Sequence, residues 1–172
     1  MIGTEVALQD MLFCRERRAD IQNMLSRKYH CPVISFCMNI PGPIKTNPEI
    51  RSAFENGKET LMKQMNAGTL SVFEKIEFHE NTGDELIMAV DHPADSLKAM
   101  TTQIEETHPC GRLFDMDVID TDGRKLSRST YRKCILCGCQ AQECARMRRH
   151  SVKAMQDKIE EILRSGEQQT SF

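Results

Sequence analysis

The sequence predicts an α+β or mixed α/β fold in a single domain, with helices packed on a mixed sheet. Its 172 residues suit one domain with a hydrophobic core of its own. Segments with helical periodicity alternate with short strand-like runs, in the order α-β-α-β-β-α-β-β-α. This order is typical of that fold class, and a nucleotidyltransferase-like arrangement is one candidate within it.

The first helix is expected from Glu5 to Tyr29, where apolar residues recur at helical spacing beside a charged face. A near-continuous apolar run from Pro32 to Ile40 then predicts a strand that is buried on both faces. Pro41, Gly42 and Pro43 end this strand, because they cannot continue a regular ladder.

The second helix is expected to begin after Asn47, which is a favourable N-cap, and to stop at Gly68. The later predicted elements are strands at 71–80 and 85–91, a helix from Pro93 to Thr107, a strand at 113–119, a turn at 120–123 into a further strand, and a helix from Ala141 to Arg164. The domain is expected to end at Arg164, and residues 165–172 are expected to form a disordered tail.

Composition points to a cytoplasmic protein without a membrane partner. Aromatic residues make up only 5%, Trp is absent, and the 11 Met residues are expected to fill the core instead. We find no apolar run of membrane-spanning length and no secretory signal. In such a chain the eight Cys are expected to be thiols or metal ligands and not disulfides.

Charge is distributed unevenly along the chain. Residues 124–153 hold nine basic residues and one acidic residue, so this segment carries +8 and the rest of the chain −10. Helical spacing predicts that Arg146, Arg149 and Lys153 share one face. The segment is either a solvated surface or a binding face for an anionic partner, and nucleic acid, phosphates and an acidic protein all remain candidates.

The most distinctive local pattern is Asp115-Met116-Asp117. Residues two apart in a strand point to the same face, so the two carboxylates are expected to lie side by side. Adjacent carboxylates repel each other unless a cation lies between them, and Mg²⁺ prefers such oxygen ligands. The alternative is an amphipathic edge strand with two solvated Asp residues.

Several nearby residues are suited to binding phosphate. Gly111 permits close approach of the backbone, and Arg112 can clamp a phosphate with two hydrogen bonds. Gly42 and Lys45 precede a helix N-terminus, which attracts anions but is also an ordinary strand-to-helix connection. His108 is the one histidine beside these residues, and it is either catalytic or structural.

The cysteine segment has a Cys-x₂-Cys spacing at Cys134 and Cys137, followed by Cys139 and Cys144. This spacing occurs in zinc knuckles, although the second pair of ligands usually comes from further along the chain. Zn²⁺ is therefore a second candidate ion, with Cys134, Cys137 and Cys144 as ligands. The alternatives are free thiols at a strand-to-helix junction and a redox pair.

Several motifs follow one another in a fixed order. They are Pro41-Gly42-Pro43-Ile44-Lys45, His108-Pro109-x-Gly111-Arg112-Leu113-x-Asp115-x-Asp117-Val118, Ser127-Arg128, Cys134-x-Leu136-Cys137 and Cys144-Ala145-Arg146. In this order they resemble the citrate lyase holo-acyl-carrier-protein synthase family. The resemblance covers roughly Pro32 to the final helix, and Cys139 departs from the family pattern.

The resemblance implies a reaction and its partners. The donor would be triphosphoribosyl-dephospho-CoA, and the acceptor would be a serine of the acyl carrier (gamma) subunit of citrate lyase. Asp115 and Asp117 would hold Mg²⁺ on the triphosphate, while Arg112, Lys45 and Arg128 would offset its charge. Arg124 also lies close enough in sequence to reach the triphosphate, and the remaining bases would face an acidic carrier.

Two alternatives stay open at this point. One is a related prosthetic-group transferase for another carrier, such as that of malonate decarboxylase. The other is a small zinc-containing module that binds nucleic acid through the +8 segment. We do not expect a nucleic-acid partner, because aromatic residues for base stacking are scarce and the Asp pair would repel a phosphate backbone.

Overall fold

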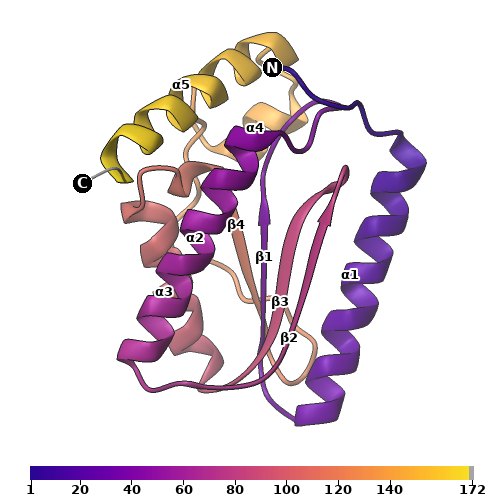
Figure 1. The fold of residues 1–172 in the computed structure, drawn as a ribbon, viewed down its shortest axis with the longest axis vertical. Helices are drawn as coiled ribbons and strands as arrows, with labels where there is room; N and C mark the ends of the chain where they lie inside the picture. Colours follow the sequence, from indigo (N-terminus) through magenta and orange to yellow (C-terminus); the bar gives the residue numbers. More distant parts are fainter. Residues whose placement is uncertain (171–172) are drawn as a thin grey trace.

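The computed structural model describes residues 1–170, which form one four-stranded sheet with helices on both faces (Figure 1). The strands are β1 (Val33–Met38), β2 (Ser71–Glu80), β3 (Gly83–Asp91) and β4 (Phe114–Ile119), in the spatial order β2-β3-β1-β4. The predicted α+β class is confirmed. The sheet is not mixed as expected, however. In the described part of the chain all strand pairs are antiparallel: β1 with β3, β1 with β4, and β2 with β3.

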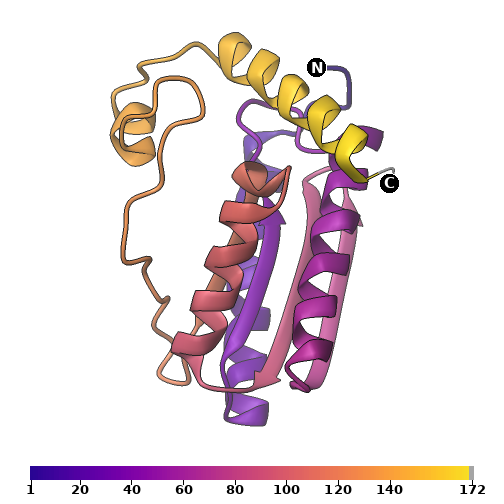
Figure 2. The same cartoon turned by 90° about the vertical axis from the view of Figure 1, so that its left-hand side faces the viewer.

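The helices are α1 (Leu8–Tyr29), α2 (Pro48–Ala67), α3 (Ala94–Thr107), α4 (Ala141–Arg146) and α5 (Val152–Thr170), with a 3₁₀ turn η1 (Gly111–Leu113) before β4. Figures 1 and 2 show α2 and α3 side by side on one face of the sheet, α1 on the other face, and α5 across one end. None of these helices is both long and apolar enough to cross a bilayer.

Two hydrophobic clusters hold these layers together. The larger cluster lies between the sheet and α2 and α3, and in it the fully buried ring of Phe36 contacts those of Phe54 and Phe114. The smaller one lies under α1 and includes Leu25, Val33 and Ile87. β1 is therefore buried on both faces, as its apolar sequence predicted.

The strand predicted after the 120–123 turn does not extend the sheet. The chain makes one bridge between Ile119 and Lys125 and then leaves β4. Side chains occupy the open edge of β4 instead. Glu105 Oε1 accepts a hydrogen bond from Met116 N at 2.7 Å, Lys98 Nζ donates to Met116 O at 3.1 Å, and Arg132 Nη2 donates to Phe114 O at 2.5 Å. Because these backbone groups are already satisfied, β4 needs no further strand.

The predicted last helix is divided in two. It breaks between Arg146 and Val152, where Arg148 has a left-handed φ of 47° and the Ser151 hydroxyl accepts a hydrogen bond from Ala154 N to begin α5. The basic residues at 146, 149 and 153 therefore do not share one helical face. α5 continues to Thr170 and not to Arg164 as expected, and the rest of the predicted tail, 171–172, lies outside the described residues.

We predict that Gly57→Ala destabilises the protein, although Ala usually favours a helix by about 1 kcal/mol over Gly. A Cβ at Gly57 would lie 2.6 Å from Phe114 Cζ and 2.9 Å from Phe36 Cζ, inside the aromatic cluster. The expected loss is about 1–3 kcal/mol, measured by urea unfolding. Gly68→Ala is the control, since its Cβ would come no closer than 3.4 Å to Leu70 and 3.5 Å to Gln64 O. A more stable Gly57→Ala protein would contradict the packing described here.

Candidate active site

Asp115 and Asp117 lie on the face of β4 that is turned toward α1, where they stand opposite Cys37 and Ser35 of β1. This is the shared face that the strand spacing predicted. Both side chains are only half-buried, because α1 packs on β1 and β3 and leaves this part of the edge strand open. Burial, together with the charge of Asp117, raises the pKa of the Asp115 carboxyl. The two adjacent carboxylates thus form a site that favours a bound cation.

Basic side chains surround the two carboxylates and offset part of their negative charge. Lys125 Nζ lies 2.5 Å from Asp117 Oδ2, and the charges of Arg132 and Arg18 also favour the ionised form of Asp115. Two of these cations have another role. Arg18 forms an ion pair with the buried Glu85 at 2.7 Å. Arg132 caps the open edge of β4 by donating a hydrogen bond to the Phe114 carbonyl. Burial and the charge of Asp117 nevertheless keep the pKa of Asp115 raised, so the carboxylate remains one whose ionised form a further cation would favour.

Two open cavities meet at the carboxylates. One, of about 640 Å³, lies between β4 and the 125–145 segment, and its other lining residues include the bases Lys98, Arg128 and Arg132. The other, of about 400 Å³, lies between β1, the loop after it and α1. Both are lined by Asn39, Asp115, Asp117 and Lys125. A group bound in either cavity can therefore reach the same pair of carboxylates.

A third cavity extends the basic surface. It measures about 840 Å³ and shares Arg128 and Arg132 with the carboxylate cavity. Arg112, Lys133 and Lys158 add three more bases, against one acidic side chain, Glu106. The two cavities share residues 128 and 130–132, and their combined basic surface beside the carboxylates is here named the basic channel.

The residues predicted to bind phosphate near β1 have mainly structural contacts. Lys45 lines the cavity under α1, where its Nζ donates to Ile40 O at 2.7 Å and burial lowers its pKa. Gly42 has a φ of 92° and packs against α5, since a Cβ there would lie 2.7 Å from Gln156 Nε2. Gly111 is needed for packing on α3, because its Cβ would lie 2.5 Å from Glu105 O.

The predicted arginines occupy three different places. Arg112 donates to the Lys133 carbonyl and lines the large basic cavity. Arg128 forms an ion pair with Glu105, whose side chain is only 3% exposed. Arg124 is exposed in the turn after β4, beside the acidic side chains of that turn.

His108 has structural contacts, and the Cys37 thiol beside the carboxylates is buried. His108 Nδ1 accepts a hydrogen bond from Cys110 N at 3.1 Å, and its ring contacts Phe114, which points to the opposite face from Asp115. Burial lowers the pKa of His108. Burial also raises the pKa of the Cys37 thiol to about 12, so this neighbour of the carboxylates stays protonated at neutral pH.

Sequence patterns did not indicate five residues of this site: Asn39, Lys98, Lys125, Arg132 and Arg18. The signal for Lys125 was present, because the 120–123 turn folds the chain back and places Lys125 beside the end of β4. Arg132 and Arg18 gave no such signal. Arg132 comes from an irregular segment, and Arg18 comes from a helix far away in the sequence.

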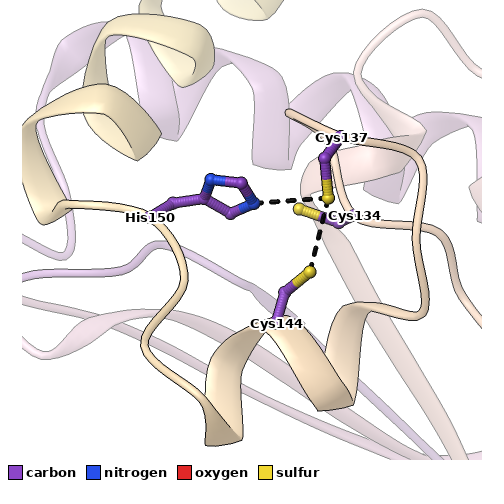
Figure 3. Close-up of side chains that lie close together, drawn as sticks. All are labelled: Cys134, Cys137, Cys144 and His150. Carbon is purple, nitrogen blue, oxygen red and sulfur yellow. Dashed lines mark hydrogen bonds between the residues drawn. The ribbon is translucent and has the colours of Figure 1, made fainter.

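The predicted cysteines belong to the segment between β4 and α5, residues 120–151, which projects to one side of the sheet (Figure 2). Cys134, Cys137 and Cys144 lie together with His150, which sequence analysis did not include (Figure 3). Hydrogen bonds from the Cys139 backbone, and then from His150 and Cys144, lower the pKa of Cys137 to about 6. All three cysteines are free thiols in the structure.

Comparison with known proteins gives a consistent result. The family model described as apo-citrate lyase phosphoribosyl-dephospho-CoA transferase matches residues 6–166. A probable apo-citrate lyase phosphoribosyl-dephospho-CoA transferase of Vibrio cholerae serotype O1 is 36% identical over 163 residues, which cover 91% of each chain. The apo-citrate lyase phosphoribosyl-dephospho-CoA transferase of Citrobacter koseri is 32% identical, over 94% of this chain and 91% of the relative. The protein of the same name in Escherichia coli O157:H7 is 31% identical, over 92% of this chain and 88% of the relative.

We predict that Asp115→Asn raises the melting temperature of the metal-free protein. The substitution removes a half-buried charge that repels Asp117, and each kcal/mol gained corresponds to roughly 2–4 °C in a protein of this size. Asp20→Asn on the exposed side of α1 is the control and should change stability by less than about 0.5 kcal/mol. A lower melting temperature for Asp115→Asn would mean that the carboxylate stabilises the fold.

We predict that Arg128→Met costs about 3–5 kcal/mol of stability, because it leaves the buried Glu105 carboxylate without its ion-pair partner. Arg124→Met in the exposed turn serves as the control, with an expected change of less than about 0.5 kcal/mol. Denaturant unfolding of both variants measures the difference. Equal stabilities would show that the pair with Glu105 contributes little.

Proposed function

The chain belongs to the apo-citrate lyase phosphoribosyl-dephospho-CoA transferase family, and from this premise we propose what it does. It attaches the phosphoribosyl-dephospho-CoA prosthetic group to a serine of the acyl carrier (gamma) subunit of citrate lyase. The donor is triphosphoribosyl-dephospho-CoA, and the reaction is a nucleotidyl transfer. The observation that supports this assignment best is the pair of carboxylates at the junction of two cavities, beside a basic channel.

The proposed reaction sets three demands on the site. The serine oxygen attacks the α-phosphorus of the donor, the bond from that phosphorus to the bridging oxygen breaks, and pyrophosphate leaves. The serine proton must go to a base, and a phosphodiester remains on the carrier. The site must therefore offset the triphosphate charge, hold the serine in line with the leaving group, and exclude competing water.

The carboxylate pair fits a Mg²⁺ ion. Mg²⁺ usually keeps several waters and binds through one or two carboxylates together with substrate phosphates, so two Asp residues are a sufficient protein contribution. Burial, and after it the neighbouring charge of Asp117, raises the pKa of Asp115, and a bound cation would favour the ionised form of both carboxylates. We propose that Asp115 and Asp117 hold the ion, which when bound would neutralise charge on the triphosphate.

The basic side chains would bind the remaining phosphate oxygens. Lys125 lies between the two cavities and is the nearest cation to the carboxylates, so it is the first candidate for a phosphate contact. Lys98 and Arg132 are fixed on the edge of β4 and present charge at low reorganisation cost. The donor, with its long pantetheine arm, would lie along the channel on this side.

The acceptor serine would then approach from the cavity under α1. This cavity shares Asp115 and Asp117 with the cavity that the bases line, and an in-line transfer would need the attacking oxygen and the leaving pyrophosphate on opposite sides of the phosphorus. Its smaller volume, about 400 Å³, suits the tip of a loop better than a nucleotide. We assign no thiol to this chemistry, because the Cys37 thiol stays protonated and the carrier supplies its own nucleophile.

The carrier would dock on the exposed bases at the end of α4 and in the loop after it. Arg146, Arg148 and Arg149 are all exposed there, and α4 itself lines the carboxylate cavity. Acyl carrier proteins are typically acidic, so opposite charge would guide the encounter. This docking surface depends on the break between α4 and α5 and not on one continuous helix.

We predict that Asp115→Asn and Asp117→Asn each slow transfer by at least ~10²-fold, the cost of removing one electrostatic stabiliser from an active site. Mass spectrometry of the apo-carrier, incubated with donor and Mg²⁺, measures the modification. Asp20→Asn is the matched control on α1. Near-normal turnover of Asp115→Asn would remove the carboxylate pair from the mechanism.

We predict that the double variant Arg146→Glu/Arg149→Glu modifies the carrier more slowly at low salt and binds the donor normally. Exposed charges act mainly on the encounter rate, so the deficit should shrink as salt rises. Arg27→Glu/Lys63→Glu makes the same change in net charge on exposed positions of α1 and α2, and should have little effect. Loss of donor affinity in the first variant would place these bases at the phosphates instead.

A further inference from the structure

We propose that Cys134, Cys137, Cys144 and His150 together bind one Zn²⁺ ion. The ion would hold the segment between β4 and α5, residues 120–151, in its folded form. The site lies apart from the carboxylates and does not depend on the proposed transfer reaction. The sequence offered only three sulfur ligands for such an ion, and the structure adds the fourth ligand, a histidine nitrogen.

The four ligand atoms have the spacing of a tetrahedral site. They all lie within 4.8 Å of one another and point toward a common centre (Figure 3). Cys137 Sγ lies 3.4 Å from Cys144 Sγ and 3.3 Å from His150 Nε2. Ordinary zinc–sulfur and zinc–nitrogen bond lengths give edges of about 3.8 Å and 3.6 Å in a tetrahedron, so these two distances lie within a few tenths of an ångström of those in a zinc site.

The backbone from Cys134 to Cys139 is shaped to present two sulfurs on one side. Gly138 N donates to Cys134 O at 3.0 Å, and Cys134 N donates to Cys139 O at 2.6 Å, which closes a tight turn. Gly138 has a φ of 72°, a conformation that favours glycine. A bridge between Lys133 and Gln140 holds the base of this turn.

The break between α4 and α5 supplies the other two ligands. Cys144 belongs to α4, and Arg149 N donates back to Cys144 O at 3.0 Å, so the chain reverses and brings His150 toward the sulfurs. In a continuous helix, six residues would separate Cys144 from His150 by about 9 Å along the axis and place them on different faces. The break therefore creates the fourth ligand position.

Ordinary packing does not explain the order of this segment. Between Tyr131 and His150, the only buried residues are Cys134 and Cys144, two of the proposed ligands. Helix α4 has six residues and is too short to be stable in water on its own. A segment that lacks an apolar core needs a disulfide or a metal, and the sulfur atoms here are free thiols.

The proposed ion would act on the active site through α4. Gln140, Ala141, Gln142 and Ala145 form one wall of the cavity that contains Asp115 and Asp117. Arg132, which caps β4, lies just before the first proposed ligand. Zinc would thus have a structural role, and the four ligands would be positioning residues for this wall.

Metal analysis of the purified protein tests the proposal directly. After exhaustive dialysis, we expect one equivalent of zinc per chain, measured by plasma mass spectrometry. Cys144→Ser and His150→Ala should each weaken zinc binding by at least ~10–100-fold, the loss already seen when only an outer-shell partner of a metal ligand is removed. Cys139→Ser is the matched control, because Cys139 lies in the same turn but outside the cluster, and it should bind zinc normally.

Cobalt titration of the unmodified protein keeps the test independent of variants that fail to fold. Tetrahedral Co²⁺ with thiolate ligands should give intense visible bands, and added Zn²⁺ should abolish them. Chelation should also speed tryptic cleavage after Arg146, Arg148 and Arg149 while leaving the sheet intact. Substoichiometric zinc with no cobalt bands, or a disulfide between Cys137 and Cys144 in the freshly purified protein, would overturn the proposal. Asp115→Asn should keep its zinc even if it loses transfer, which separates this site from the proposed function.

Discussion

The structure depends on how the free edge of β4 is satisfied. Side chains from α3 and from the segment after β4 bond the backbone of Phe114 and Met116, so no further strand covers this edge. The chain after Lys125 is then free to move away from the sheet and form the walls of the cavities. A fifth strand in that place would have filled the space that now opens beside Asp115 and Asp117. The absence of a regular ladder at this edge is thus what makes the site.

The carboxylate pair on the same edge strand lowers the stability of the fold. Two carboxylates on one strand face repel each other, and burial together with this repulsion raises the pKa of Asp115. Such an arrangement persists because the rest of the sheet, with the Phe36, Phe54 and Phe114 cluster on its other face, is well packed. A cation and a polyanionic donor would together relieve the repulsion, so ligand binding and stability are coupled at this site.

The site is built from one rigid part and one part that is held by few contacts. β4 and α3 fix the carboxylates and the capping bases through buried hydrogen bonds. The opposite wall, α4, belongs to a segment with almost no buried apolar residues. The proposed zinc ion would make this wall as well defined as the sheet, while the exposed bases beside it stay available to a partner.

The sequence by itself determined most of the elements and the chemistry of the carboxylate pair. Apolar periodicity located β1, α2 and the β2–β3 pair, and the two-residue period of a strand placed Asp115 and Asp117 on one face. These features depend on local rules. Only the tertiary structure decided that side chains would close the edge of β4, that Arg128 would pair with Glu105, and that the last helix would break and bring His150 to the cysteines. These three outcomes depend on contacts between residues distant in sequence or on an irregular backbone, and neither leaves a periodic signal in the chain.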